Sequence, residues 1–123
     1  MYTAELDKSK RLLKIICCQR VDAEEVERCA NELPALLAEL QAGFRLLTDF
    51  SRLESMDVTC APHIQRIMDL CNAKGVGTVV RVITDPHKDI GLNIMSLFHY
   101  GPGVRIVACD TLEEAMKVLE GAG

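Results

Sequence analysis

The middle of the chain, residues 44–83, decides the fold and is FRLLTDFSRLESMDVTCAPHIQRIMDLCNAKGVGTVVRVI. The apolar segment Phe44–Phe50 predicts a buried strand, and the polar residues Ser51–Asp57 predict a connecting turn. A helix then follows and stops at Gly75. The β-branched segment Val76–Ile83 predicts a second strand that is buried on both faces. A strand, a helix and a strand in this order indicate a parallel pair within an α/β sheet.

Pro62 locates the start of the central helix. With Thr59 as the N-cap, Pro62 is the third helical residue, where a missing N–H has no intrahelical partner to lose. With Asp57 as the N-cap, Pro62 would remove an intrahelical hydrogen bond. We therefore expect Thr59 to cap this helix. Its apolar side chains share one face, which predicts a core stripe of Cys60, Ile64, Ile67, Met68 and Cys71.

The residues before this unit predict a β-hairpin and a helix. Two short strands at Tyr2–Leu6 and Arg11–Cys18 flank a polar turn. Asp22 is the expected N-cap of an amphipathic helix that ends near Gly43. Pro34 lies inside this helix and is expected to kink it.

The residues after the unit complete the alternation of strands and helices. A helix is predicted from Pro86 to Tyr100, a strand at Val104–Cys109, and a last helix behind the capping box Thr111–Glu114. The order is ββαβαβαβα. It predicts one α/β domain over residues 1–123, with a mixed, mainly parallel sheet and helices packed on it.

Composition excludes several classes of protein. The chain has 123 residues, a net charge of −4 and 49% apolar residues, which is typical of a folded globular domain. The acidic balance argues against a nucleic-acid partner. No apolar run is long enough to span a membrane, and the N-terminus lacks the apolar region of a signal peptide. We expect a cytoplasmic protein.

The cysteines predict free, buried thiols rather than a disulfide framework. They form no Cys-x-x-Cys pair, and several lie within apolar runs. Free cysteines behave as small apolar side chains in a reducing compartment. The six residues are Cys17, Cys18, Cys29, Cys60, Cys71 and Cys109.

Three segments resemble the STAS domain of anti-sigma-factor antagonists, the SpoIIAA-like superfamily. Leu46–Thr59 is similar to the family's strand and loop, which ends in Met-Asp-Ser-Ser/Thr-Gly before a helix. Arg20–Ala23 resembles the Gly-x-Leu-Asp opening of its first helix. Residues 97–115 resemble its last helix, strand and helix. The resemblance covers nearly the whole chain and implies a STAS-like fold.

The resemblance also implies a function and a site. In the family, a partner kinase phosphorylates a Ser or Thr after the loop aspartate, and the added charge abolishes binding. Carried over, Asp57 matches the aspartate, Val58 the first hydroxyl position, and Thr59 the phosphoacceptor. The chain departs from the family pattern at Val58 and Cys60, which replace Ser and Gly, and at Gln19, which replaces a glycine.

The implied protein is a non-catalytic regulatory module that binds an anti-sigma-like kinase or another signalling protein. The expected contact surface is the loop before the central helix and the beginning of that helix. Its residues are Ser51, Met56, Asp57, Val58, Thr59 and His63.

An alternative function is a small-molecule or lipid-binding domain in which the helix at 86–100 is a lid over an apolar pocket. His87 and Lys88 would then lie at the start of the lid, with Phe98 and His99 near the mouth of the pocket. The apolar residues of this helix cover more than one face. The helix is therefore either wedged deeply into the core or exposes a patch for a partner, such as a second copy in a homodimer.

A thiol enzyme that uses Cys60 and His63 is a further alternative, since a thiol near a helix start is acidified. Cys60 and His63 have the Cys-x-x-His spacing of metal ligands, and Cys71 lies on the same helix. No fourth ligand is within reach on that helix, however. The motifs GxSxG, GxGxxG and HExxH and a phosphate-binding P-loop are all absent from the sequence. We therefore expect no enzyme activity, no cofactor and no metal.

Overall fold

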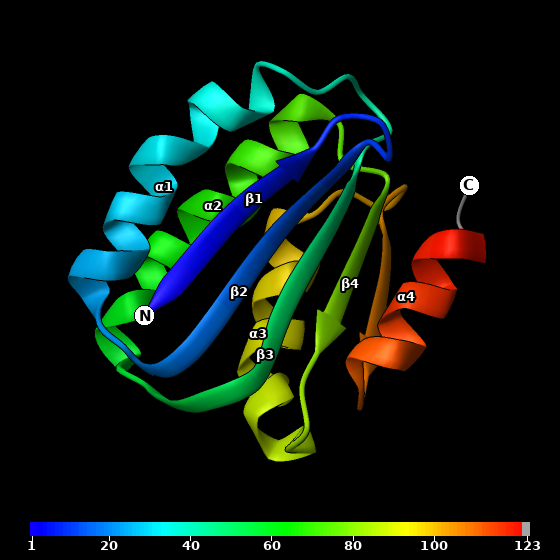
Figure 1. Ribbon diagram of the computed structural model, residues 1–123. Coiled ribbons are helices and arrows are strands. Elements are labelled where there is room, and N and C mark those ends of the chain that lie inside the picture. Colours follow the sequence, from blue (N-terminus) through cyan, green and yellow to red (C-terminus); the bar gives the residue numbers. More distant parts are fainter. Residues whose placement is uncertain (122–123) are drawn as a thin grey trace.

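The computed structural model describes residues 1–121, without the side chains of residues 86–90 and 93. A mixed five-stranded sheet has its strands in sequential order from β1 to β5 (Figure 1). β1 pairs with β2 antiparallel, and all other neighbours are parallel. This confirms the predicted order of elements and the mixed sheet. The elements are β1 Tyr2–Asp7, β2 Leu12–Val21, α1 Ala23–Leu37, β3 Arg45–Met56, the 3-10 helix η1 Val58–Cys60, α2 Ala61–Lys74, β4 Thr78–Val82, α3 Pro86–His99, β5 Arg105–Cys109 and α4 Leu112–Gly121.

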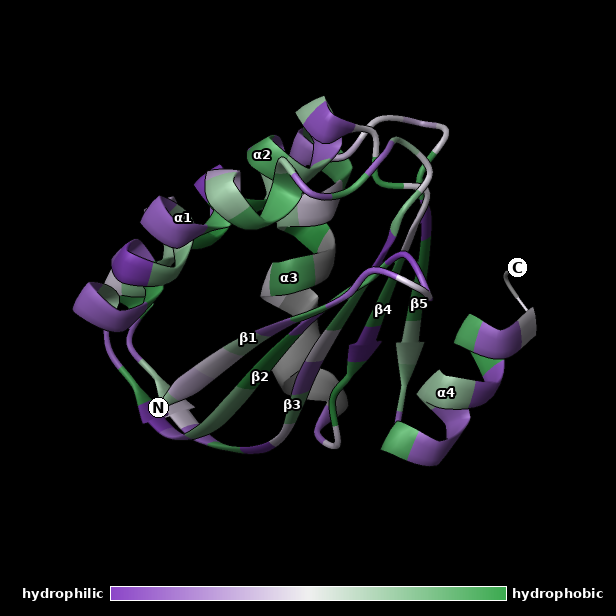
Figure 2. Ribbon diagram, turned by 45° about the horizontal axis from the view of Figure 1, so that its top comes forward, coloured by the Kyte–Doolittle hydropathy of each residue, from purple (hydrophilic) through white to green (hydrophobic). Residues whose placement is uncertain are grey.

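The helices divide unequally between the two faces of the sheet. Right-handed crossovers between sequential parallel strands place α1, α2 and α3 on one face. α4 follows the last strand and covers part of the opposite face (Figures 1 and 2). Two separate apolar cores result. The core under α1, α2 and α3 includes Leu13, Ile15, Leu33, Phe44, Leu46, Cys71 and Val79; the core under α4 includes Leu12, Leu47, Val80, Val82, Cys109, Ala115 and Leu119.

The start of α1 confirms the predicted cap, but its end differs from the prediction. Asp22 accepts a hydrogen bond from the Glu25 amide at 2.9 Å, and the Glu25 side chain accepts one from the Asp22 amide. The helix ends at Leu37 instead of near Gly43, one turn after Pro34. Its apolar spacing nevertheless continues to buried Leu40, because a tighter turn with i to i+3 hydrogen bonds follows the helix.

The prediction of a turn at residues 51–57 is wrong, because β3 continues to Met56. This extension pairs with an equally unexpected extension of β2, through Arg52 opposite Cys18 and Met56 opposite Val21. In the extension, exposed Arg52 and Glu54 flank a half-buried Leu53. Polar side chains on the solvent side of a strand were thus mistaken for a turn.

The cysteines and the end of α2 agree with the predictions. All six thiols are free; Cys18 is partly exposed and the others are buried. Gly75 ends α2 in the left-handed conformation with φ of 94°. A side chain there would also collide with Ala42, so glycine is required at this position.

Candidate functional site

The segment Met56–Cys60, which we call the β3–α2 turn, lies at the carboxyl end of β3. One turn of 3-10 helix, η1, follows Asp57. The Asp57 Oδ1 accepts a hydrogen bond from the Thr59 amide at 3.0 Å, and the Asp57 carbonyl accepts one from the Cys60 amide at 3.0 Å. Asp57 therefore caps η1.

The prediction that Thr59 caps the central helix is consequently wrong. α2 begins only at Ala61, so Pro62 still lies in its first turn, where its missing N–H has no cost. The reason for the error is the short 3-10 helix, which allows Asp57 to cap one turn and α2 to begin after it.

The tip of the β3–α2 turn presents an apolar and a hydroxyl side chain to solvent. Val58 is 83% exposed, and Asp57 and Thr59 are exposed on either side of it. Hydrogen bonds from the backbone amide and the hydroxyl of Thr59 lower the pKa of Asp57, with a smaller effect of the Arg20 charge. Asp57 is therefore ionised at neutral pH beside the Thr59 hydroxyl.

The end of β2 lies directly beside this turn. The Asp57 amide donates to the Val21 carbonyl at 3.5 Å, and the Cys60 thiol lies 3.7 Å from the same oxygen. A groove of about 250 Å³ runs between the two segments and includes Arg20 and Asp22. Sequence reasoning missed Arg20 and Asp22 as part of this site, although the carboxyl ends of neighbouring parallel strands meet at one edge of a sheet.

The two positions where the family pattern has glycine differ in their backbone. Gln19 has φ of 58°, which is the left-handed region that favours glycine. It lies at an irregularity in the β2–β3 pairing. Cys60 has φ of −70°, which any residue adopts. The first replacement therefore strains the backbone, and the second does not.

Of the predicted partner-binding residues, Ser51 lies apart from the turn, and His63 follows the turn in the first turn of α2. Ser51 is inside β3, five strand residues before Met56 and thus roughly 16 Å away along the strand. Its amide donates to Asp49 Oδ1 at 2.9 Å. His63 contacts α1, with its Nε2 atom 3.6 Å from Glu27 Oε2. Met56, Asp57, Val58 and Thr59 do come together.

The side chains of α3 separate into buried and exposed groups. Leu92 and Met95 are half-buried against the sheet side, whereas Ile94, Leu97 and Phe98 are exposed by 52%, 81% and 81%. We call these three exposed residues the α3 patch. The His99 Nδ1 atom lies 2.7 Å from Asp69 Oδ1 of α2.

Two of the four expected lid residues, Phe98 and His99, do not lie at a pocket mouth. Neither Phe98 nor His99 lines the two apolar pockets beside α3, because Leu92 and Met95 occupy that side of the helix. The side chains of His87 and Lys88, which were also assigned to the lid, lie outside the described residues.

Cys60 is a core residue. It is 0% exposed, and its burial, followed by the charge of Asp57, raises the pKa of its thiol. A protonated, inaccessible sulfur is a poor nucleophile, so the thiol-enzyme alternative fails for this residue.

Within the described part of the chain, no three His, Cys, Asp or Glu side chains are grouped to hold a metal ion. Among the same residues, no helix has the length and apolarity needed to cross a membrane.

Comparison with known proteins places the fold. No protein-family model and no curated protein matches the chain. A solved structure from Shewanella loihica PV-4, of an uncharacterized DUF3478-family protein with a SpoIIAA-like fold, is 16% identical with a TM-score of 0.70. The match covers 97% of this chain and 92% of that one.

Anti-sigma factor antagonists are similar as well. The unphosphorylated form of SpoIIAA is 17% identical with a TM-score of 0.64, over 98% of this chain and 99% of that one. The phosphorylated form of the Bacillus cell fate determinant SpoIIAA is 16% identical with a TM-score of 0.63, over 97% and 99% of the two chains. The chain therefore has the SpoIIAA-like, or STAS, fold that its motifs indicated.

Proposed function

We propose that this chain is a cytoplasmic regulatory domain that binds a protein partner through the β3–α2 turn, and that phosphorylation of Thr59 switches this binding. The observation that carries the proposal is the exposure of Val58 between Asp57 and Thr59. Burial of an exposed β-branched side chain against a partner is favourable, because it removes apolar surface from water. No step of this function needs a catalytic residue.

Phosphorylation would act on the charge of this surface. A phosphate adds about −1.5 to −2 charges at neutral pH. At Thr59 this charge would stand beside ionised Asp57, and the Thr59 amide that could otherwise bind it already donates to Asp57. The surface around Val58 would then become strongly anionic and would repel a partner that buries it.

The proposed class of partner rests on an analogy with proteins of the same fold. SpoIIAA, which has the same fold, is known in a phosphorylated and an unphosphorylated form and is an anti-sigma factor antagonist. By analogy, the partner proposed for this chain is an anti-sigma-like kinase or another signalling protein.

Phosphoacceptor mapping tests the switch. The full chain is incubated with ATP in an extract of its source cells, and the modified residue is located by mass spectrometry. We expect phosphate on Thr59 and its loss in Thr59→Ala. Thr84 is the matched control, because it is an exposed threonine after the neighbouring strand β4. Phosphate on Thr84, or on neither residue, contradicts the switch.

Binding by variants tests the surface. Val58→Asp and Thr59→Glu should each weaken capture of the native partner by at least about tenfold, since both place a charge in the contact. Phe98→Asp, in the α3 patch, is the control and should retain the partner. If Phe98→Asp alone loses it, the contact surface is the α3 patch. That patch is also where the predicted homodimer would form, which sedimentation of Phe98→Asp would detect.

A further inference from the structure

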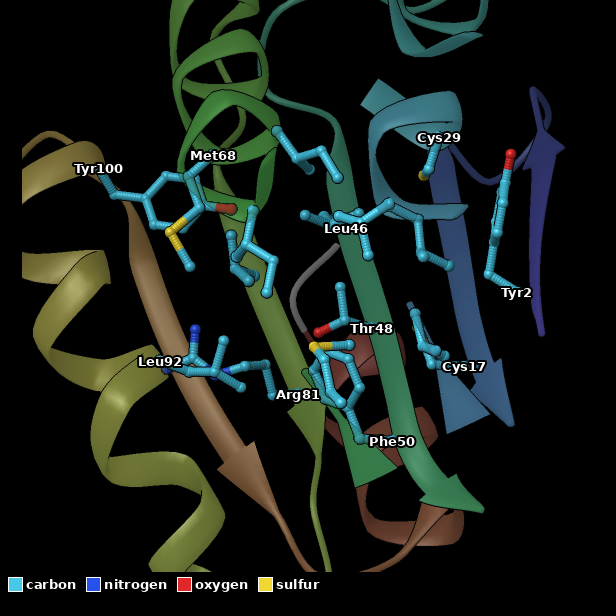
Figure 3. Close-up of a pocket in the computed structure, with 17 residues that line it drawn as sticks. Tyr2, Cys17, Cys29, Leu46, Thr48, Phe50, Met68, Arg81, Leu92 and Tyr100 are labelled. Carbon is cyan, nitrogen blue, oxygen red and sulfur yellow. The ribbon is translucent and has the colours of Figure 1, made fainter. Parts of the chain in front are cut away.

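A cavity of about 60 Å³ lies between the sheet and helices α1, α2 and α3 (Figure 3). Its walls are almost entirely apolar and come from β1, β2, β3 and β4 as well as from the helices. By the same measure, a single water needs roughly 10–15 Å³, so the space is large enough for a small organic molecule. The apolar side chains that line it include Leu46, Phe50, Ile67, Met68, Val79 and Leu92.

One polar group in the cavity lacks a partner. Thr48 lines the cavity, and its Oγ1 atom is buried without a hydrogen bond to any described residue. A buried hydroxyl with no partner is costly, and such groups are rare in folded proteins. Thr48 stands at the centre of the lining side chains in Figure 3. The Thr48 hydroxyl is therefore an unused hydrogen-bonding site within apolar walls.

Arg81 also reaches this cavity, but it is engaged by the protein. It is the register partner of Thr48 on β4 and is 2% exposed. Its guanidinium donates to the Ser96 hydroxyl at 2.9 Å, and Ser96 donates to the Leu92 carbonyl at 2.8 Å. This chain of hydrogen bonds holds Arg81 against α3. The neutral hydroxyl of Thr48 is therefore the fully buried side-chain oxygen that is available to a ligand.

A route to solvent adjoins the cavity. A second pocket of about 490 Å³ lies at the carboxyl edge of the sheet, between β3, α2 and α3. Four side chains line both spaces: Phe50, Met56, Ile64 and Leu92. These side chains form the partition between the outer pocket and the cavity. A ligand can pass when they change rotamer, and the flexible side chain of Met56 adapts readily.

We propose that the cavity binds a small, neutral, apolar molecule with a single hydroxyl group, such as a phenol or an alcohol, which hydrogen-bonds to Thr48 Oγ1. Apolar walls favour an apolar body, and a hydroxyl can both donate to and accept from the threonine. A charged ligand would lose its hydration in these walls without a free counter-charge. This site lies next to the β3–α2 turn proposed for the protein partner and shares Met56 with it, and the outer pocket is also lined by Asp57 and Val58.

Phenol and toluene are suitable probes, because they have nearly the same shape and differ by a hydroxyl in place of a methyl group. Dissociation constants for both are measured on the full chain by titration, with the methyl NMR signals of Leu46, Ile67 and Val79 as reporters. Thr48→Val removes the hydroxyl at nearly constant volume. Thr78→Val is the matched control, since Thr78 is a buried threonine on β4 that does not line the cavity.

The expected result is binding of both probes, with a preference for phenol over toluene that falls about tenfold in Thr48→Val and is unchanged in Thr78→Val. If neither probe at millimolar concentration shifts the three reporters, no ligand site exists. If Thr48→Val keeps the wild-type preference, or if Thr78→Val loses it equally, Thr48 does not recognise a hydroxyl. Either result overturns the proposal.

Discussion

The two faces of the sheet are built differently. The core under α4 is a small cluster of apolar side chains. The opposite core, under α1, α2 and α3, contains a cavity, the unpartnered hydroxyl of Thr48 and the guanidinium of Arg81. The β3–α2 turn also begins the helix on this side (Figure 2). The face under α1, α2 and α3 is therefore the one with a cavity and an unpartnered hydroxyl, which are the features that a ligand site needs.

The largest expected effect is the loss of stability when a buried leucine on either face of the sheet is truncated to alanine. Leu46 and Leu47 are neighbours on β3 that face opposite cores and are 1% and 2% exposed. Leu47→Ala should lower the free energy of unfolding by about 4 kcal/mol, and Leu46→Ala by about 2.5 kcal/mol. Leu46 lines the cavity and so loses fewer packing contacts on truncation. Urea unfolding measures both values. Equal losses, or a larger loss for Leu46→Ala, would contradict a difference in packing between the faces.

An intermediate effect concerns pH. Burial raises the pKa of Cys17 to about 12, of Cys29 to about 11 and of Cys71 to about 12, from a usual value of about 9. All three thiols belong to the core under α1, α2 and α3. Above pH 9 the unfolded chain loses these protons while the folded chain keeps them. The stability that the protonated thiols contribute is therefore complete below pH 9 and decreases as the pH rises towards 12.

Cys71→Ala checks this assignment. The free energy of unfolding, measured in urea between pH 6 and 11, should fall less steeply with rising pH above pH 9 in the variant. Each such thiol accounts for up to about 1.4 kcal/mol per pH unit. Below pH 8 the two profiles should be parallel, which separates the titration from the general cost of removing a buried sulfur. Identical slopes above pH 9 would show that Cys71 does not titrate in this way.

The smallest expected effect is the loss of stability when the N-cap of a helix on either face is removed. Asp22 caps α1 with a reciprocal hydrogen bond from Glu25, and Thr111 caps α4 by accepting from the Glu114 amide at 3.1 Å. Asp22→Ala should cost about 1.5 kcal/mol and Thr111→Ala about 0.7 kcal/mol, because only Asp22 adds a negative charge at the helix start. Thermal unfolding resolves this difference. A larger loss for Thr111→Ala would show that α4 depends more on its cap.

Local signals predicted most of the fold correctly. Asp22, Thr111 and Gly75 mark helix ends, and the apolar β-branched segment around β4 marks a buried strand. These features depend on residues close together in the chain. The extension of β3 was missed because its pairing with the end of β2 involves residues far apart in the sequence.

The candidate site likewise has one part that local sequence predicted and one part that depends on residues far apart in the chain. Asp57, Val58 and Thr59 were identified from a short motif, and the structure keeps them adjacent at an exposed turn. Their neighbours Arg20 and Asp22 belong to another strand and helix, so only the parallel pairing of β2 with β3 brings them close. Ser51 lies inside β3 at a distance from the turn, because the strand continues through the segment that was predicted as a turn.

The order of the elements, the caps of α1 and α4 and the apolar character of the thiols could be predicted from the sequence, since propensity and spacing act over a few residues. The tertiary structure alone decided that Thr48 and Arg81 face one cavity, that Leu46 and Leu47 enter different cores, and that Phe98 points to solvent. These outcomes depend on strand register and on which helices cover each face, and both are set by contacts between distant parts of the chain.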